Sequence, residues 1–291
     1  MDWVNAVVQG VLLGGVFALF ATGLSLAFGV MRLVNLAHGQ LALLAAFATV
    51  SVAEATDWNP LVALAVVVPA MAVLGYLLQR GVLDHTLAGD GDPLRSILVT
   101  FGLAVVIENL LLERYSADSR GLAAGTIETA SIRVTDDLAI GWFRLIGLLV
   151  AIAVLAGLAL FLARTRTGRA LRAVADDRAT AELMGIDTHR INGIAMALAL
   201  ATVAIAGVFL GIQTTFAPSD GNVLLLSAFE AVIIGGLGSL WGTLAGGITL
   251  GVAQTVGAQI EPGWSALIGH LVFLAVLVAR PTGLFPRTAP A

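Results

Sequence analysis

The stretch WVNAVVQGVLLGGVFALFATGLSLAFGVM, residues 3–31, decides the fold class because it is long, apolar and free of charged side chains. A helix that crosses the roughly 30 Å hydrocarbon core of a bilayer needs about 20 apolar residues. Two further uncharged runs, 33–53 and 58–79, are also long enough. They lack the alternation of membrane β-strands, and lipid leaves only helices and closed barrels as spanning structures. The sequence therefore predicts an all-α, polytopic bundle of transmembrane helices.

The composition of the whole chain supports this prediction. Of 291 residues, 58% are hydrophobic and only 12% are charged, and the mean hydropathy is +0.96. Soluble domains carry about 25% charged residues. We expect nine spans, or eight if one of them is not a full crossing: 8–29, 36–54, 60–80, 95–112, 142–163, 191–213, 221–237, 240–258 and 264–279. The weakest are the fourth and the glycine-broken stretch 235–242, which could be short, tilted or re-entrant.

The distribution of arginine predicts the orientation, because cytoplasmic loops collect basic residues. With the C-terminus inside and nine alternating spans, 11 of the 15 arginines face the cytoplasm. The other four, Arg114, Arg120, Arg133 and Arg144, lie in or beside an expected outer loop at 113–141, which also carries several acids. Nine spans place the N-terminus outside and eight place it inside. The first run lacks a positively charged start and a cleavage site, so we expect it to remain as a span.

Several functional classes are excluded by residue types that the chain lacks. All 15 basic residues are arginine and there is no cysteine. Without lysine there is no G-x-x-x-x-G-K-[ST] phosphate loop, so the chain is not a conventional P-loop ATPase. Without cysteine there are no disulfides or cysteine metal sites. The net charge of −4 argues against a nucleic-acid binder. No catalytic or metal-binding spacing occurs, so we expect no catalytic residue, no metal and no cofactor in this chain.

The most informative polar segment is RTRTGRALRAVADDRATAELMGIDTHR, residues 164–190, which lies between two strong spans. Its apolar residues fall near one face at helical spacing, which predicts a short amphipathic helix; they are Leu171, Val174, Ala175, Ala181 and Met184. Gly185 is a plausible stop, and Asp187 a plausible cap for the next span. The segment could be a helix that docks into a cytoplasmic partner. It could equally be a solvated loop that obeys the arginine rule.

Glycines mark a second candidate region. Gly238, Gly242 and Gly246 form a G-x-x-x-G-x-x-x-G pattern, preceded by Gly235 and Gly236. Small residues four apart let helix backbones approach closely in lipid, so packing alone would explain them. The alternative is that this glycine-rich stretch lines or hinges a translocation path, because missing side chains leave room for solute and motion.

Polar residues at membrane depth are further candidates, because they are costly there. Glu230 follows nine uncharged residues and precedes thirty. It could meet a substrate ammonium, an arginine or a proton, or make an interhelical hydrogen bond. Glu108 and His270 are weaker candidates. Asn35 and His38 open the second span: Asn35 could cap it, and His38 could line the mouth of a path or belong to a capped helix start.

Taken together, four segments along the chain resemble the LivH-type branched-chain amino acid permeases of ATP-binding-cassette (ABC) importers. They are GLSLAFGVMRLVNLAHGQ at 23–40, TGRALRAVADDRATAELMGID at 167–187, EAVIIGGLGSLWGTLAGG at 230–247 and RPTGLFP at 280–286. The resemblance implies an ABC importer permease fold in one domain, 1–291, in the bacterial inner membrane. It also implies partners: a homologous LivM-type permease, a periplasmic or lipid-anchored solute-binding protein, and two cytoplasmic ATPase subunits that hydrolyse the ATP.

The same resemblance implies that 167–187 is the coupling helix. The expected contacts with the ATPase are Arg169, Arg172, Ala175, Asp176, Asp177, Ala179, Ala181 and Gly185. The two aspartates depart from the strict coupling-loop pattern of importers, so which of these residues touch the ATPase stays open. Mechanistically, the resemblance implies alternating access, a two-state switch driven by ATP in the partner subunits.

Three other functions stay open at this point. The same machinery could carry urea, short amides or other amino acids. A secondary transporter could use Glu230 as its proton or sodium site. A scaffold protein of the membrane would not need so many glycines and is the weakest alternative.

Overall fold

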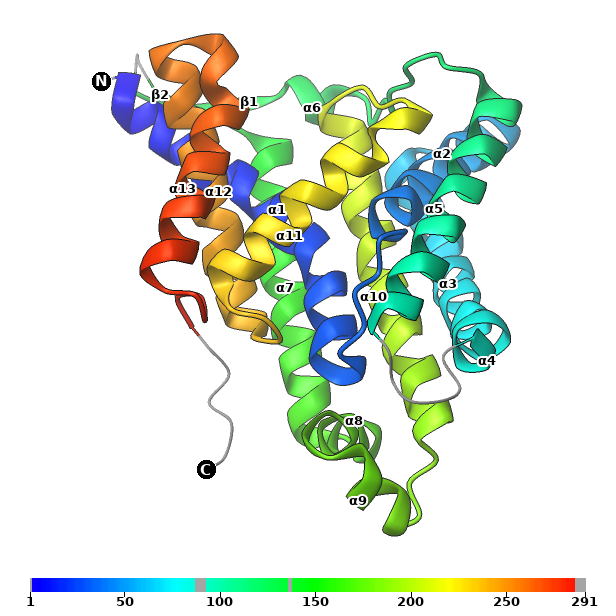
Figure 1. Ribbon diagram of the computed structural model, residues 1–291. Helices are drawn as coiled ribbons and strands as arrows, with labels where there is room; N and C mark the ends of the chain where they lie inside the picture. The colour runs from blue at the N-terminus through cyan, green and yellow to red at the C-terminus, as the bar shows by residue number, and fades with distance from the viewer. Residues whose placement is uncertain (1, 87–92, 136–137, 286–291) are drawn as a thin grey trace.

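The computed structural model describes residues 2–86, 93–135 and 138–285. Each predicted span corresponds to a helix in these ranges (Figure 1): α1 (Asp2–Met31), α2 (His38–Thr56), α3 (Pro60–Leu78), α5 (Pro93–Tyr115), α7 (Trp142–Arg164), α10 (Thr188–Gln213), α11 (Gly221–Gly235), α12 (Leu240–Ile260) and α13 (Ser265–Ala279). The all-α bundle is thus confirmed. Residues 136–137 of the expected outer loop, the last residue of the 280–286 segment and the C-terminal arginine lie outside the described residues.

Shorter elements connect these helices. They are a π-helical turn η1 (Gln79–Leu83), α4 (Asp84–Thr86), α6 (Thr126–Thr129), α8 (Arg166–Asp176), α9 (Arg178–Leu183) and the 3₁₀ turns η2 (Pro218–Asp220) and η3 (Pro262–Trp264). The predicted outer loop contains a structure that the sequence analysis missed. In it β1 (Ser131–Thr135) pairs antiparallel with β2 (Leu138–Gly141), with Ile132 opposite Ile140.

The glycine-broken stretch between α11 and α12 proves to be a sharp reversal. By length and apolar composition, seven helices in the described ranges can each cross a membrane, and α11 with α12 qualifies only as a pair bent by 118°. By length and composition the count is up to eight if that pair is one span. The start of α1 and the end of α13, however, lie towards opposite ends of the bundle, which fits an odd number of crossings: nine if α11 and α12 each cross, or seven if they form a re-entrant pair (Figure 1). Because the chain reverses here, α12 returns towards the end of the bundle from which α11 came (Figure 1). The fourth predicted span, by contrast, is a regular helix of 23 residues.

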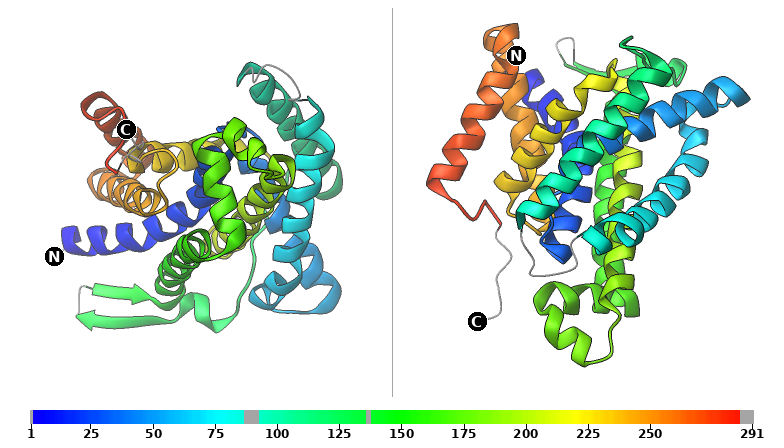
Figure 2. Two further views of the ribbon diagram at one scale, coloured as in Figure 1. Left: turned by 90° about the horizontal axis from the view of Figure 1, so that it is seen from below. Right: turned by 45° about the vertical axis from the view of Figure 1, so that its right-hand side comes forward.

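The bundle has two distinct ends. The β1–β2 hairpin lies at one end, which we call the hairpin end, and α8 and α9 project from the other, which we call the coupling end (Figures 1 and 2). Both α1 and α13 begin at the hairpin end and run towards the coupling end (Figure 1). The sequence prediction that 113–141 and 164–190 lie on opposite sides of the membrane agrees with this arrangement.

Helices α1 and α10 form the centre of the bundle. In their apolar windows 78% and 67% of residues are buried, against 6% in the last span. Glycines allow α1 to lie directly against α12, because a Cβ at Gly14 would clash with Ile248 and one at Gly251 would clash with Gly10. Close backbone approach through small residues is the main way helices associate in lipid, where no hydrophobic drive acts between them.

The connection 32–37 is irregular backbone inside the bundle. Arg32 adopts a left-handed φ of 52° and ends α1. A side chain on α5 then contributes to the connection, since Thr100 Oγ1 accepts from Leu36 N at 3.1 Å. The one proton of this hydroxyl has its nearest acceptor in Ser96 O, at 2.7 Å, with Val34 O at 3.3 Å. Non-helical backbone is tolerated at membrane depth only where protein covers it. This anchor therefore lets α2 begin inside the bundle, where His38 is buried.

Candidate functional site

The coupling segment, residues 165–187, begins with a capped reversal after α7. Thr165 Oγ1 accepts a hydrogen bond from Gly168 N at 2.9 Å and so caps α8. Gly168 lies so close to α7 that a Cβ would come within 2.7 Å of Leu162 O. The TRTG sequence therefore fixes α8 across the end of the bundle.

The predicted amphipathic helix is confirmed for α8, which buries Leu171, Val174 and Ala175. Its continuation as one helix through Met184 was wrong, because α9 is a separate helix. The chain is extended at Asp177, with φ −148° and ψ 107°. The Asp177 carboxylate accepts from the backbone N–H of Ala179 and Thr180, at 2.9 and 3.2 Å, and so caps α9. An aspartate between two helical turns competes with the backbone in this way, which a count of apolar spacing does not detect.

Helix α9 ends in a Schellman motif, as the glycine predicted. Gly185 has φ +80°. Its N–H donates to Glu182 O and the Ile186 N–H donates to Ala181 O, both at 3.0 Å, which is the pattern of this cap. Asp187 then accepts from Arg190 N at 2.9 Å and caps α10, as expected.

One face of the segment packs onto the bundle. Leu171, Val174 and Ala181 are buried in a cluster with Leu26 of α1 and Ile191 of α10. The cluster links the segment to the two central helices. A displacement of α8 or α9 would therefore act directly on the centre of the bundle.

The outer face of the segment carries the other predicted contact residues. Ala175 is buried, whereas the exposed members are Arg169, Arg172, Asp176, Asp177, Ala179 and Gly185. Met184 was predicted on the buried face, and this was wrong: it is 77% exposed and its neighbour Leu183 is 87% exposed. The cause is the break at Asp177, which rotates the face of α9 relative to that of α8. The sequence reasoning missed these two residues, which give the projecting tip an apolar surface.

Three carboxylates stabilise this fold, and we call them the acceptor carboxylates: Asp177, Glu182 and Asp187. Hydrogen bonds from the Thr180 hydroxyl and backbone lower the pKa of Asp177. The Thr188 hydroxyl, at 2.6 Å, and Arg178 lower the pKa of Glu182. The backbone N–H of Arg190 lowers the pKa of Asp187. All three are therefore ionised at neutral pH.

Glu230 lies in the membrane-embedded part of α11 and is 1% exposed. One carboxylate oxygen, Oε1, pairs with His270 Nδ1 on α13. The other, Oε2, has no partner in the described ranges. The His270 side chain is 42% exposed, so it lies at the edge of the bundle. The structure thus shows an interhelical pair, while a role of Glu230 in a translocation path stays a prediction.

Asn35 and His38 have different surroundings from those predicted. The N-cap of α2 is Ala37, and Asn35 instead accepts from Ala37 N at 3.0 Å within the turn. His38 Nε2 bonds to Phe20 O at 2.9 Å, and the ring is 1% exposed. It therefore lines no open mouth in this conformation. The reason is that the connection 32–37 enters the bundle before α2 begins.

The glycines at the α11–α12 reversal serve close packing. A Cβ at Gly235 would clash with Gly242, and one at Gly246 would lie 2.7 Å from Gly235 N. The segment after α13 also packs here, because Leu284 N donates to Ile234 O at 2.8 Å and Phe285 N to Gly235 O at 3.0 Å. Two of the segments that carry the family resemblance, 230–247 and 280–286, are thus neighbours.

The remaining two glycines of the predicted path lie in the same turn. Gly236 is buried, with φ +106°. Gly238, with φ +79°, lines a pocket at the coupling end. Packing is what the structure shows for this set, and a contribution to a translocation path stays a prediction. In the described ranges no group of three or more acidic or histidine side chains could hold a metal ion.

The sequence that forms these helices is similar to sequences of known proteins. The sequence model of a family described as "branched-chain amino acid transport system / permease component" matches residues 6–279. The chain belongs to this permease family. The match covers the coupling segment, Glu230 and the α11–α12 reversal.

Curated permeases align with nearly the full chain. The high-affinity branched-chain amino acid transport system permease protein BraD of Pseudomonas aeruginosa is 29% identical, over 98% of this chain and 96% of BraD. LivH of Escherichia coli K12 is 27% identical, over 96% and 94% respectively. A probable LivH of Methanocaldococcus jannaschii is 25% identical, over 94% and 90%. This permease is therefore a multi-pass membrane protein with the fold of ABC transporter permeases.

Proposed function

We propose that the chain is the membrane-spanning subunit of an ABC importer that moves branched-chain or related amino acids into the cytoplasm. It forms a single permease domain, contributes no cofactor or catalytic site, and depends on two partner ATPase subunits that hydrolyse ATP. A LivM-type permease completes the pore, and a periplasmic or lipid-anchored binding protein delivers the solute. The cell inner membrane is its location, with the C-terminus and the coupling end in the cytoplasm.

The observation that carries this proposal is the projecting coupling segment. Its inner face is buried against α1 and α10, and its tip exposes Leu183 and Met184. Exposed apolar groups rimmed by charged ones mark protein contacts. A partner that binds this tip can move α1 and α10, because the inner face of the segment packs against both. An ATP-driven switch between two conformations requires such a connection.

The cargo follows from the family and from the chemistry of the bundle. The α-amino and carboxylate groups of an amino acid carry no net charge but each needs a polar partner, and sites that are mostly apolar with a few placed polar groups bind such solutes. Urea, short amides and other amino acids would satisfy the same requirement. Competition of these solutes with labelled leucine for uptake ranks them directly.

An ion-coupled secondary transporter is the second candidate, because Glu230 Oε2 is buried without a partner in the described part of the chain. Proteoliposomes that hold the permease pair, with and without the ATPase subunits, separate the two. The importer proposal requires uptake that continues with an ionophore and stops without ATP. Uptake by the permease pair alone, driven by an ion gradient, would establish the secondary transporter instead.

Orientation can be measured with single cysteines, since the natural chain has none. A cysteine at Met184, on the coupling segment, should react with a membrane-impermeant maleimide only after cells are opened. A cysteine at Ser119, which is exposed in the expected outer loop, should react in intact cells. The reverse pattern would rule out a cytoplasmic ATPase partner at α9.

A further inference from the structure

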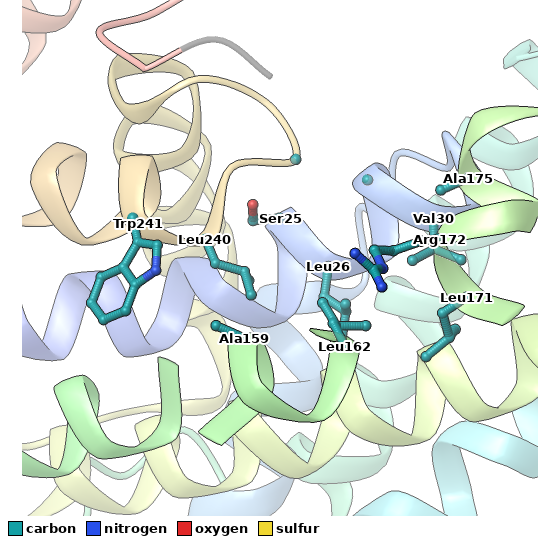
Figure 3. Close-up of a pocket in the computed structure, with 12 residues that line it drawn as sticks. Ser25, Leu26, Val30, Ala159, Leu162, Leu171, Arg172, Ala175, Leu240 and Trp241 are labelled. Carbon is teal, nitrogen blue, oxygen red and sulfur yellow. The ribbon is translucent and has the colours of Figure 1, made fainter. Parts of the chain in front are cut away.

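A pocket of about 210 Å³ lies at the coupling end between α1, α7, α8 and the turn that leads into α12 (Figure 3). Its walls are mostly aliphatic, formed by Leu26, Val30, Ala159, Leu162 and Leu240. The pocket therefore joins the coupling segment to the α11–α12 reversal. Its apolar walls suit a hydrocarbon chain.

Two polar groups of the pocket have no partner within the described ranges. Ser25 is 1% exposed and its Oγ makes no hydrogen bond there. A buried hydroxyl without a partner is unfavourable, and a ligand oxygen would supply one. The Arg172 side chain is exposed, and its guanidinium forms none of the ion pairs or side-chain hydrogen bonds found among described residues. In the view of Figure 3, Ser25 lies just above Leu240, and Arg172 lies further to the right.

Tryptophan places the mouth of the pocket at a membrane surface. Four of the five tryptophans lie at the hairpin end, at the starts or ends of elements there: Trp3, Trp58, Trp142 and Trp264. Trp241, at the start of α12, belongs to the pocket and is 53% exposed. Tryptophan gathers at both membrane–water interfaces. Trp241 therefore marks the interface at the coupling end, where lipid phosphates lie next to acyl chains.

We propose that this pocket binds one anionic phospholipid from the leaflet at the coupling end. The guanidinium of Arg172 pairs with the phosphate, since arginine matches phosphate geometry with two parallel N–H donors. The Ser25 hydroxyl donates to an ester or glycerol oxygen, and an acyl chain fills the aliphatic walls. Basic pockets between helices on the cytoplasmic side hold anionic lipids in this way. The bound lipid would connect α8 to α1 and to the α11–α12 reversal.

The test uses Trp241 as the reporter. The full chain with Trp3, Trp58, Trp142 and Trp264 changed to phenylalanine is reconstituted in phosphatidylcholine vesicles. Dibrominated phosphatidylglycerol or dibrominated phosphatidylcholine is then titrated in and quenches fluorescence on contact. The proposal expects a several-fold preference for phosphatidylglycerol at Trp241.

Matched variants assign that preference to the pocket. Arg172→Gln should abolish the preference, so that the two brominated lipids quench Trp241 equally. Arg169→Gln removes the same charge one turn away on α8. Arg169 donates to Arg164 O at 3.4 Å and does not line the pocket. This variant should therefore leave the preference for phosphatidylglycerol unchanged. Arg172→Lys, which keeps the charge, should retain part of it. Equal quenching by both lipids would mean that Trp241 meets only the annular lipid around the protein. Equal loss of the preference in Arg172→Gln and Arg169→Gln would mean only a general attraction between charges. Either result overturns the proposal.

Discussion

Replacement of Gly185 by valine should loosen the end of α9 without crowding any neighbour. Gly185 has φ +80°, and a Cβ there would meet nothing within 4 Å. The cost is therefore conformational. An L-residue in the left-handed region pays roughly 1–2 kcal/mol, and a β-branched one is a genuine outlier there. To escape this cost the chain must give up the two hydrogen bonds of the Schellman motif.

A cost of about 1–2 kcal/mol multiplies the open population by roughly 5–30. Backbone amides at 184–187 should exchange with deuterium faster by a factor in that range, as measured by mass spectrometry. In proteoliposomes with the ATPase subunits, solute moved per ATP hydrolysed should fall, because the tip no longer transmits displacement to α1 and α10. Membrane insertion should be unchanged, since the segment projects from the bundle.

Two controls make this prediction sharp. Gly185→Asn should retain most of the coupling, because asparagine tolerates the left-handed region. Gly263→Val adds the same side chain at the hairpin end, where a Cβ also meets nothing within 4 Å, and should have no effect. Exchange at the wild-type rate in Gly185→Val, together with unchanged uptake per ATP, would refute the reasoning.

Three further outcomes are expected. Gly246→Ala should lower the free energy of unfolding by about 1–3 kcal/mol, since its Cβ would lie 2.7 Å from the α11 backbone. The control in the same unfolding assay is Gly102→Ala, which has open space around it. In Glu230→Gln, ATP-driven uptake and its pH dependence should be unchanged, because an amide can still bond to His270. Loss of uptake would show that transport requires the carboxyl group. The lowered pKa values of the acceptor carboxylates mean that their stabilisation is complete above the ordinary carboxyl range near pH 4 and is lost as pH falls through the lowered values. A spin label on Leu183→Cys should therefore keep its mobility from pH 8 to about pH 5 and loosen only in stronger acid; loosening near neutrality would contradict this assignment.

The sequence predicts the helices of this permease well because lipid permits few alternatives. Apolar length alone located α1, α3 and α7. The reversal at 235–242 was expected only as a weak point, since its 118° angle depends on the fit of two helices against each other. The buried position of the α2 start could not be found from Asn35 and His38, because partners of this turn lie far along the chain, such as Thr100, 64 residues from Leu36.

At the candidate site, local signals succeeded and distant ones failed. Gly185 and Asp187 were assigned as stop and cap, because each acts on backbone within a few residues. The partner of Glu230 was not found, since His270 lies 40 residues further along the chain and no periodicity links the two. The face of Met184 was wrong because one hydrogen-bonding side chain, Asp177, resets the helical phase.

The Thr100 anchor constrains how the chain is made. Ribosomes complete α1 and α2 before α5 exists, so the backbone N–H of Leu36 enters the translocon without its Thr100 partner. Lipid does not accept such a segment. We therefore expect water or protein to solvate this N–H group until α5 inserts, and a nascent chain halted before residue 100 should be degraded faster than the full chain.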